Sequence, residues 1–488
     1  MDVKAELVRV VGSENVLDSP DVLEAYSKDY SLNQPSLPNY VVRPGSIEGI
    51  QGIMRFADGQ RIPVVPSSSQ VHFYGATIPG QGGIILDLRR MNRILDINER
   101  DRTVRIEPGV TWEQLQTELE GKGYRMVIPL FPHPLKSVIT TWLEMEYPVI
   151  SVFEYGMPLQ SMRLVWANGD IYTTGSASVT TFGQPGCVAT GVNPTGPGSL
   201  NFFQLLQGAQ GTMGVTAWAM FKFEELPRLG KTFFIPTHNL EEAIEPVYKI
   251  QRRKIGCEFL LLNNLNLATI LAENWPEDFE HLRQILPPWT AIMILMGLHR
   301  RPEEKIEYEE EALREVMKLD FQDLELSTAL RGVPALERRL PQMLRRPWPK
   351  DKTYWKHCYK GGCQDLFFIT TLDKAPQFVE IVNEVAGRNE YPLSDIGCYI
   401  QPIENARACH CEFNFYYNPD NPAEVEKIYR LYNEAAQALL EWGAFFSRPY
   451  DILADMVYQR TADYTASLKK MKTIVDPNNI LNPGKLCF

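Results

Sequence analysis

The first half of the chain alternates short apolar runs with amphipathic stretches. Proline or glycine lies at or next to the end of most of these runs, which are of strand length: VVRPGS at 41–46, IPVVP at 62–66, GGIILDL at 82–88 and TVRIEPG at 103–109. Residues 47–57 and 112–119 have a helical pattern between or after the runs. Ser46 and Thr111 precede these helices, and each can accept a hydrogen bond from the first turn. The order of elements is typical of an α+β nucleotide-binding domain.

The pattern changes near residues 225–227, and beyond that point helices and strands alternate more evenly. Strand-length runs lie at 258–262, 291–298, 366–370, 396–400 and 409–416, and helical stretches at 240–253, 302–318, 376–386 and 423–442. The last helix ends at Gly443, a residue type that favours helix C-termini. This pattern predicts an antiparallel sheet covered by helices. We therefore divide the chain into residues 1–226, 227–442 and 443–488.

Composition and charge narrow the class of protein. The chain has 488 residues, of which 44% are hydrophobic and 22% charged, as expected for a folded protein of two or three domains. No apolar run approaches the ~18 residues of a membrane-spanning helix, and the first ten residues lack a signal-peptide core, so we expect a cytoplasmic protein. The net charge of −11 argues against nucleic-acid binding. Residues 331–350 are basic and proline-rich, which fits a solvated loop or a docking surface for an acidic partner.

The eight cysteines are too sparse for a disulfide scaffold, and none forms a CxxC pair. We expect free thiols and no four-cysteine iron–sulfur cluster in this chain. An electron-transfer partner could still carry such a cluster.

A loop of small residues carries the first candidate chemistry. It lies within residues 62–94 and contains Ser67-Ser68-Ser69 and the turn Gly75-Ala76. Successive main-chain N–H groups in such a loop can surround a pyrophosphate, and small side chains let the backbone approach the ligand. The GxGxxG and GxxxxGK[ST] fingerprints do not occur in the sequence.

Three further segments have ligand-binding character. They are PHPLKSVITTWLEMEY at 132–147, the glycine-punctuated FFQLLQGAQGTMGVTAWAMFKF at 202–223 and the C-terminal VDPNNILNPGKLCF at 475–488. In this order, the four segments resemble the vanillyl-alcohol oxidase superfamily of FAD enzymes, and they are most similar to its glycolate oxidase and D-lactate dehydrogenase members. The resemblance covers essentially the whole chain. It implies an α+β fold with a two-part FAD-binding domain (PCMH-type), an α/β cap domain built on an antiparallel sheet, and a C-terminal segment that returns to the FAD domain.

The resemblance also implies which residues bind the cofactor. In the family, the small-residue loop and GGIILDL form the FAD pyrophosphate site. This chain departs from the family at Ser67–Gln70, where an arginine and glycines are usual, and at Trp142, in a stretch that normally has paired glycines. The residues expected to bind FAD are Pro66, Ser67, Ser68, Ser69, Gln70, Val71, His72, Gly75, Ala76, Pro132, Ser137, Thr140, Thr141, Gly208, Gly211, Thr212, Gly214, Val215, Asn482 and Lys485.

Some relatives attach FAD covalently through a histidine in the first loop. By spacing, that position is Val71 in this chain, and His72 is one residue late, so its side chain should point elsewhere. We therefore expect non-covalent FAD, with attachment through His72 as the alternative.

The substrate side departs further from the family. Glycolate and lactate members carry two histidines in an H-x-G-D-G-N-x-H stretch, whereas the matching segment 406–415 keeps only His410, so no metal site is expected. If this segment is a strand, alternation places His410 and Glu412 on one face, with Arg407 just before and Arg448 after the next helix. We expect these four residues to form the catalytic cluster, with His410 as base and an arginine binding an anion. A core histidine and a structural ion pair of Glu412 with an arginine are the alternatives.

These residues predict a flavoprotein oxidoreductase, a dehydrogenase or oxidase. Its substrate is a small organic molecule, foremost a 2-hydroxy acid or alcohol, oxidised by hydride transfer to flavin N5. Phenol-oxidising relatives hold a phenolate with tyrosines and an arginine, so a 4-alkylphenol or aryl alcohol stays open. An electron-relay FAD subunit of a larger redox complex, with an iron–sulfur or other electron-transfer partner, is a further alternative, and a homo-oligomer also stays open.

Overall fold

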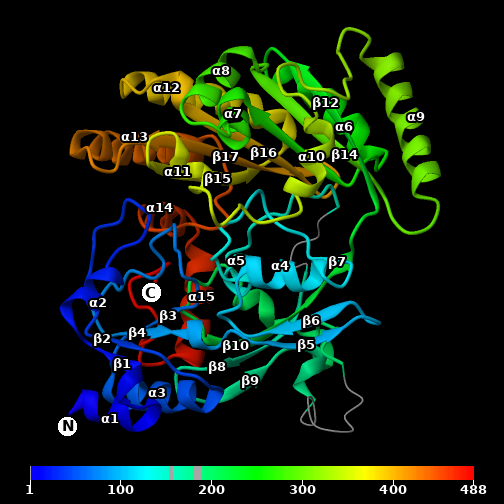
Figure 1. Ribbon diagram of the computed structural model, residues 1–488. Coiled ribbons are helices and arrows are strands. Elements are labelled where there is room, and N and C mark those ends of the chain that lie inside the picture. Colours follow the sequence, from blue (N-terminus) through cyan, green and yellow to red (C-terminus); the bar gives the residue numbers. More distant parts are fainter. Residues whose placement is uncertain (1, 153–157, 180–189) are drawn as a thin grey trace.

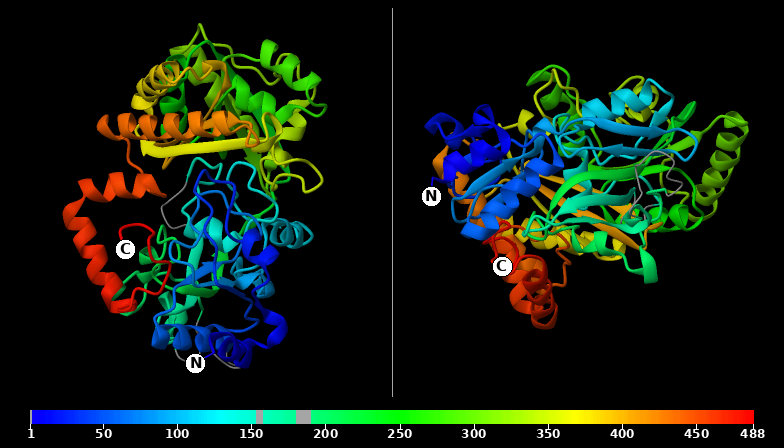
Figure 2. Two further views of the ribbon diagram at one scale, coloured as in Figure 1. Left: turned by 90° about the vertical axis from the view of Figure 1, so that its left-hand side faces the viewer. Right: turned by 90° about the horizontal axis from the view of Figure 1, so that it is seen from below.

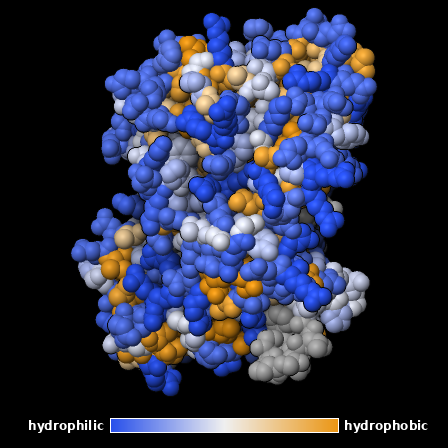
Figure 3. All heavy atoms as spheres, turned by 45° about the vertical axis from the view of Figure 1, so that its right-hand side comes forward, coloured by the Kyte–Doolittle hydropathy of each residue, from blue (hydrophilic) through white to orange (hydrophobic). Residues whose placement is uncertain are grey.

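The computed structural model describes residues 2–152, 158–179 and 190–488, which form two lobes, one above the other in Figure 1. The predicted α+β class is confirmed. The seven cysteines in the described residues are free thiols, and Cys187 lies outside the described residues. No helix in the described part of the chain is long and apolar enough to cross a membrane. One face of the molecule is mostly hydrophilic, with hydrophobic patches scattered over both lobes (Figure 3).

The lower lobe contains two sheets. The four-stranded sheet has the order β1 (Val16–Leu17), β2 (Tyr40–Val42), β4 (Ile84–Asp87), β3 (Val64–Ser67), and the five-stranded sheet has the order β5 (Ile94–Asn98), β6 (Thr103–Ile106), β10 (Val215–Lys222), β8 (Leu159–Val165), β9 (Ile171–Thr173). The helices of this lobe are α1 (Val3–Val11), α2 (Pro20–Ala25), α3 (Ile47–Gln60), α4 (Trp112–Glu120) and α5 (Val138–Leu143). Both predicted caps are confirmed, since Ser46 accepts from Gly49 N–H and Thr111 from Gln114 N–H.

The upper lobe is built on the predicted antiparallel sheet. Its strand order is β12 (Leu229–Thr237), β14 (Trp289–Gly297), β13 (Glu258–Asn263), β16 (Ile396–Ile403), β17 (Ala408–Tyr417), β15 (Gly362–Thr370). One face packs against α6 (Glu241–Arg252), α9 (Pro302–Asp320), α12 (Ala375–Arg388) and α13 (Pro422–Glu441). The other face packs against α7 (Asn264–Leu271), α8 (Glu277–Ile285), α10 (Leu336–Met343) and α11 (Trp355–Cys358). The expected boundary at 226/227 falls between β11 (Glu224–Glu225) and β12, and the one at 442/443 directly follows α13.

The C-terminal segment returns to the lower lobe. Helices α14 (Ile452–Arg460) and α15 (Ala462–Val475) run down one side of the molecule (Figure 2). Leu481 then pairs in parallel with Val64 at the edge of β3. The buried ammonium of Lys472 donates to the carbonyls of Thr212 and Leu481, 2.7 and 2.9 Å away. The last residues are therefore fixed against the glycine-containing loop that precedes β10.

A buried ion-pair triad joins the two lobes. Arg125, from the short strand β7 (Tyr124–Arg125), and Arg345 both pair with Glu258 of β13, at 2.6 and 2.8 Å. Burial alone would raise the pKa of Glu258, but the two guanidinium groups hold it below its ordinary value. Arg339 and Arg346, also in the basic stretch, pair with Glu273 and Glu120. Of these arginines, Arg345 is buried, whereas the side chains of Arg339 and Arg346 remain 45% and 61% exposed.

Candidate active site

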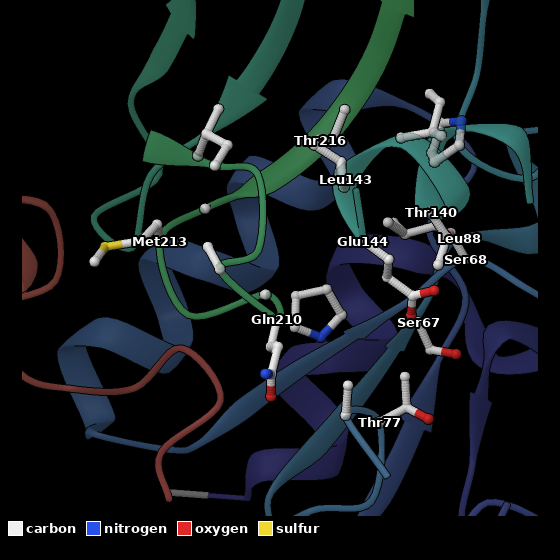
Figure 4. Close-up of a pocket in the computed structure, with 18 of the residues that line it drawn as sticks. Ser67, Ser68, Thr77, Leu88, Thr140, Leu143, Glu144, Gln210, Met213 and Thr216 are labelled. Atoms are coloured by element: carbon white, nitrogen blue, oxygen red, sulfur yellow. The ribbon is translucent and has the colours of Figure 1, made fainter. Parts of the chain in front are cut away.

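A cavity lies in the lower lobe where the loop after β3, helix α5 and the loop before β10 meet (Figure 4). It has about 810 Å³ of empty space, including the part open to solvent. Three of the four predicted ligand-binding segments contribute to it. The predicted cofactor residues that line it are Pro66, Ser67, Ser68, His72, Ala76, Thr140, Gly208, Gly211 and Gly214.

The donors of this cavity fit a phosphate-containing cofactor. Ala76 and Thr77 line it, and their main-chain N–H groups have no hydrogen-bond partner among the described residues. The Ser68 and Thr140 hydroxyls face each other at 2.5 Å. Gly211 has φ +73°, a conformation that favours glycine, and a Cβ there would lie only 3.2 Å from Pro66 Cδ. No lysine or arginine of the described chain lines the cavity, so neutral donors would hold a diphosphate here.

Other predicted cofactor residues build the wall of the cavity. Ser69 Oγ accepts from Ser137 N–H at 2.9 Å, and Thr141 Oγ1 accepts from Trp112 Nε1–H at 2.9 Å. The amide of Asn482 donates to the Ala76 and Gln210 carbonyls. The remaining members of the set also lie outside the lining of this cavity: Gln70, Val71, Gly75, Pro132, Thr212, Val215 and Lys485.

Ser137 provides a stability test for this wall. Its hydroxyl donates to the Pro108 carbonyl at 2.6 Å and accepts from Thr140 N–H as the N-cap of α5. We expect Ser137→Ala to lower the free energy of unfolding by about 1 kcal/mol, the usual cost of a lost cap. Urea unfolding checks the value. Ser36→Ala, another serine of the same lobe and one that donates no side-chain hydrogen bond to the described residues, is the matched control and should leave the midpoint unchanged.

The expectation that the His72 side chain points away from the cofactor site was wrong. His72, not Val71, lines the cavity, with Nε2 3.0 Å from Ser67 Oγ. The reason is that the segment after Ser67 is a loop without regular alternation, so spacing along the chain does not decide which side chain points inward. Burial lowers the pKa of His72 to about 4, which keeps the imidazole neutral.

A second pocket lies between β15 and β17 of the upper lobe and the loop that precedes α5. It has about 590 Å³ of empty space, including solvent-open parts. Of the four predicted catalytic residues, His410, Glu412 and Arg448 line it. Glu144 lines the first cavity and pairs with Lys136, which lines the second, so the two cavities share a wall.

The predicted alternation on β17 is present. His410 and Glu412 face the pocket, whereas Cys409 and Cys411 lie in the core on the opposite face of the sheet. His410 Nε2 is 3.2 Å from Glu412 Oε2. Burial lowers the pKa of His410 despite Glu412, and Lys356 with His410 holds the pKa of Glu412 below its ordinary value even though burial raises it. A neutral histidine therefore donates Nε2–H to a carboxylate, which leaves Nδ1 as the basic atom.

Lys356 and Asp365 belong to the same network and were missed from the sequence. Lys356 Nζ is 2.6 Å from both Glu412 Oε1 and Asp365 Oδ2. Asn414 donates to both carboxylates, at 2.8 and 2.7 Å. Asp365 stands opposite Asn414 in the register of β15 and β17, so the alternation rule applied to β15 would have found it.

Arg448 forms no salt bridge with any residue that the structure describes. Its exposed fraction is 4%, and its Nε and Nη1 are buried without a hydrogen-bond partner in the described residues. Its Cζ lies 4.0 Å from the centre of the Phe367 ring and 6.0 Å from that of Tyr147. A buried cation that has aromatic faces but no bound anion is a strong candidate for binding a ligand.

Arg407 does not join the cluster. It is exposed and does not line either cavity. It lies at the turn between β16 and β17, outside the strand, and its odd number gives it the parity of Cys409, not of His410. The geometry therefore supports three of the four expected members.

Comparison with known proteins agrees with this geometry. Residues 38–175 match the family "FAD binding domain", and residues 371–486 match "FAD linked oxidases, C-terminal domain". The chain belongs to the FAD-linked oxidases of the vanillyl-alcohol oxidase and p-cresol methylhydroxylase superfamily.

Relatives match over nearly the whole chain. Glycolate oxidase subunit GlcD of Bacillus subtilis is 24% identical, over 99% of this chain and 96% of the relative. D-2-hydroxyglutarate dehydrogenase of Stutzerimonas stutzeri is 24% identical, over 99% and 98%. The crystal structure of p-cresol methylhydroxylase with substrate bound superposes with a TM-score of 0.84 at 18% identity, covering 99% of this chain and 96% of that one, which confirms the fold. The protein is an FAD-linked oxidoreductase that acts on a small organic substrate.

Proposed function

We propose that the protein oxidises a small aryl substrate, a 4-alkylphenol or aryl alcohol, in the second pocket, and that Arg448 binds the oxygen of this substrate. The observation that carries this proposal is the buried guanidinium of Arg448, whose Nε and Nη1 have no hydrogen-bond partner among the described residues, in a pocket beside the cofactor cavity. Tyr74, Tyr147, Tyr354 and Tyr399 line the same pocket, and Phe367 lies under the guanidinium. Aromatic walls suit an aryl ring, and a guanidinium stabilises a phenolate or developing oxyanion.

The residues of the pocket would have different roles in such a reaction. FAD bound in the first cavity supplies a hydride acceptor. Arg448 would orient the substrate and hold its negative charge. His410 would accept a proton at Nδ1, because Glu412 holds Nε2–H, and Lys356 would keep Glu412 ionised. The buried walls keep bulk water from competing for these groups.

A 2-hydroxy acid is the second candidate. The open donor fork of Arg448 also suits a carboxylate, and the relatives glycolate oxidase and D-2-hydroxyglutarate dehydrogenase bear names of this class. Two features of the pocket favour the aryl substrate instead. Lys136 and Lys356 are already paired with carboxylates, and the described residues hold no cluster of three metal-ligating side chains to bind a hydroxy acid.

Anaerobic reduction of the bound flavin separates the two substrates. We expect a 4-alkylphenol to bleach the flavin absorbance in a single turnover, and D-lactate or glycolate to bleach it at least ten times more slowly. The reverse order would support the 2-hydroxy acid. If neither class reduced the flavin, while dithionite did, the chain would be an electron relay and not the catalyst.

The attachment of FAD is a separate prediction. We keep the expectation of non-covalent FAD, because Nε2 of His72 already lies within hydrogen-bond distance of the Ser67 hydroxyl. Acid precipitation of the yellow protein should release nearly all the flavin into the supernatant. Colour that stays in the pellet of the wild type but not of His72→Ala would contradict this and identify His72 as the attachment site.

An electron-transfer partner subunit also stays a proposal. The relative from Bacillus subtilis is named as a subunit of glycolate oxidase. Copurification of this chain with a second polypeptide at fixed stoichiometry would support a complex.

A further inference from the structure

The wall between the two cavities contains a buried charge triad that the proposed reaction does not use. Lys136 Nζ lies 2.5 Å from both Glu144 Oε2 and Glu146 Oε1. The exposed fractions of the three side chains are 4%, 16% and 14%. Two carboxylates share one ammonium, so the triad carries a net charge of −1 when all three groups are ionised.

The two carboxylates face different cavities. Glu144 lines the cofactor cavity, and Glu146 lines the substrate pocket together with Lys136. Figure 4 shows the Glu144 side chain entering the cofactor cavity from α5, on the side of Ser67 and across from Gln210. No other carboxylate of the described chain lines the cofactor cavity. Glu144 is therefore the carboxylate at the cofactor cavity. Glu146 carries the same chemical group but lines the substrate pocket instead.

The position of Glu144 indicates which part of FAD it meets, if FAD binds as proposed. A carboxylate repels phosphate, and the N–H groups that suit phosphate belong to Ala76 and Thr77, nine and ten residues after Ser67 in the loop that follows β3. The redox-active ring must face the substrate pocket, and Glu144 stands in the wall that the pockets share. In that orientation the ring would be the part of the cofactor nearest to Glu144.

We propose that Glu144 tunes the reduction potential of the bound flavin and that Lys136, held in place by Glu146, limits the strength of this effect. The inference rests on the proposed binding of FAD. Hydride uptake brings two electrons and one proton to the ring, so the ring gains one negative charge. A carboxylate nearby opposes that charge, and an ammonium beside the carboxylate offsets the opposition. In this role Glu144 and Lys136 are positioning residues that act through charge, since neither exchanges a proton or electron with the substrate.

Burial makes the charge of Glu144 depend on Lys136. Desolvation raises the pKa of the Glu144 carboxyl, and Lys136 opposes this rise. In Lys136→Met the two carboxyls lose their cation. At high pH they should stay ionised and lower the flavin potential, whereas at low pH they should take up protons and lower it less.

The test is the midpoint potential of the FAD-loaded variants, measured by equilibration with reference dyes. Glu144→Gln should raise the equilibrium constant for flavin reduction by about tenfold or more at pH 8. Lys136→Met should change it in the opposite direction, and Lys136→Arg, which keeps the charge, should resemble wild type. Glu146→Gln is the matched control and should have a clearly smaller effect than Glu144→Gln.

An unchanged potential in Glu144→Gln would overturn the inference, as would an equal shift in Glu146→Gln. A shift of the same sign in Glu144→Gln and Lys136→Met would also overturn it. Removal of a negative charge and removal of a positive charge should shift the potential in opposite directions, whereas a structural disturbance would shift it the same way in both variants. A colourless wild-type preparation would contradict FAD binding itself. A yellow protein with unshifted potentials would contradict only the role of the triad.

Discussion

Arg448→Met is expected to weaken substrate binding at least about 30-fold and to leave the flavin content unchanged. Truncating a buried, hydrogen-bonding charge costs about 2–5 kcal/mol of binding free energy, and each 1.4 kcal/mol is tenfold. Arg448 does not line the cofactor cavity, so FAD should stay bound. The dissociation constant of a 4-alkylphenol, from perturbation of the flavin spectrum, gives the size of the effect.

Stability distinguishes this role from a structural one. Arg448 forms no direct ion pair with the described residues, so its removal leaves no carboxylate that has lost a hydrogen-bonded partner. We expect Arg448→Met to melt at the wild-type temperature or higher, as is common where function costs stability. Arg448→Lys keeps the charge but loses the planar donor fork, and should recover only part of the affinity. A large loss of stability with unchanged affinity would show that Arg448 is a structural residue.

His410→Ala should lower turnover by about 100-fold or more, with FAD still bound. The reason is the loss of Nδ1 as proton acceptor, which the neighbouring Glu412 cannot replace while it is paired with Lys356. Stopped-flow reduction of the flavin at saturating substrate measures the step directly. Cys409→Ala, the next residue on the opposite face of the sheet, is the matched control and should reduce the flavin at the wild-type rate.

The pH profile gives an independent check on His410. Burial lowers its pKa below the ordinary value of 6.5, so the imidazole stays neutral to lower pH than a free histidine. For a base, kcat/KM is lost as pH falls through its pKa in the free enzyme. The acid limb should therefore lie below pH 6.5 and should be absent from the residual activity of His410→Ala. An unchanged limb in that variant would assign the base to another group.

Local rules predicted the parts of this structure that depend on neighbours in sequence. The helix caps at Ser46 and Thr111 follow from a hydroxyl placed before an amphipathic stretch. The common face of His410 and Glu412 follows from the period of two in a strand. The same rule gives Arg407 the wrong parity for the pocket, so its inclusion in the catalytic set was an avoidable error.

Tertiary contacts account for what the sequence did not predict. His72 enters the cofactor cavity because an irregular loop, not a strand, follows Ser67. Lys136 and Lys356 look like ordinary surface lysines in the sequence. In the folded chain both are buried, and each pairs with two carboxylates at 2.5–2.6 Å. The partners of Lys356 lie on β15 and β17, which no local pattern connects to it, whereas the partners of Lys136 follow it within ten residues and only the turn after α5 brings them back to it.

The most direct test of this account is a crystal structure of the FAD-loaded protein with an unreactive phenol bound. The account predicts flavin in the cavity between the Ala76–Thr77 loop and Gly211, with its ring toward Glu144. It predicts the phenol oxygen within hydrogen-bond distance of Arg448 and the ring of the phenol among the tyrosines of the second pocket, beside His410. Flavin bound elsewhere, or a phenol that leaves Arg448 without a ligand, would contradict it.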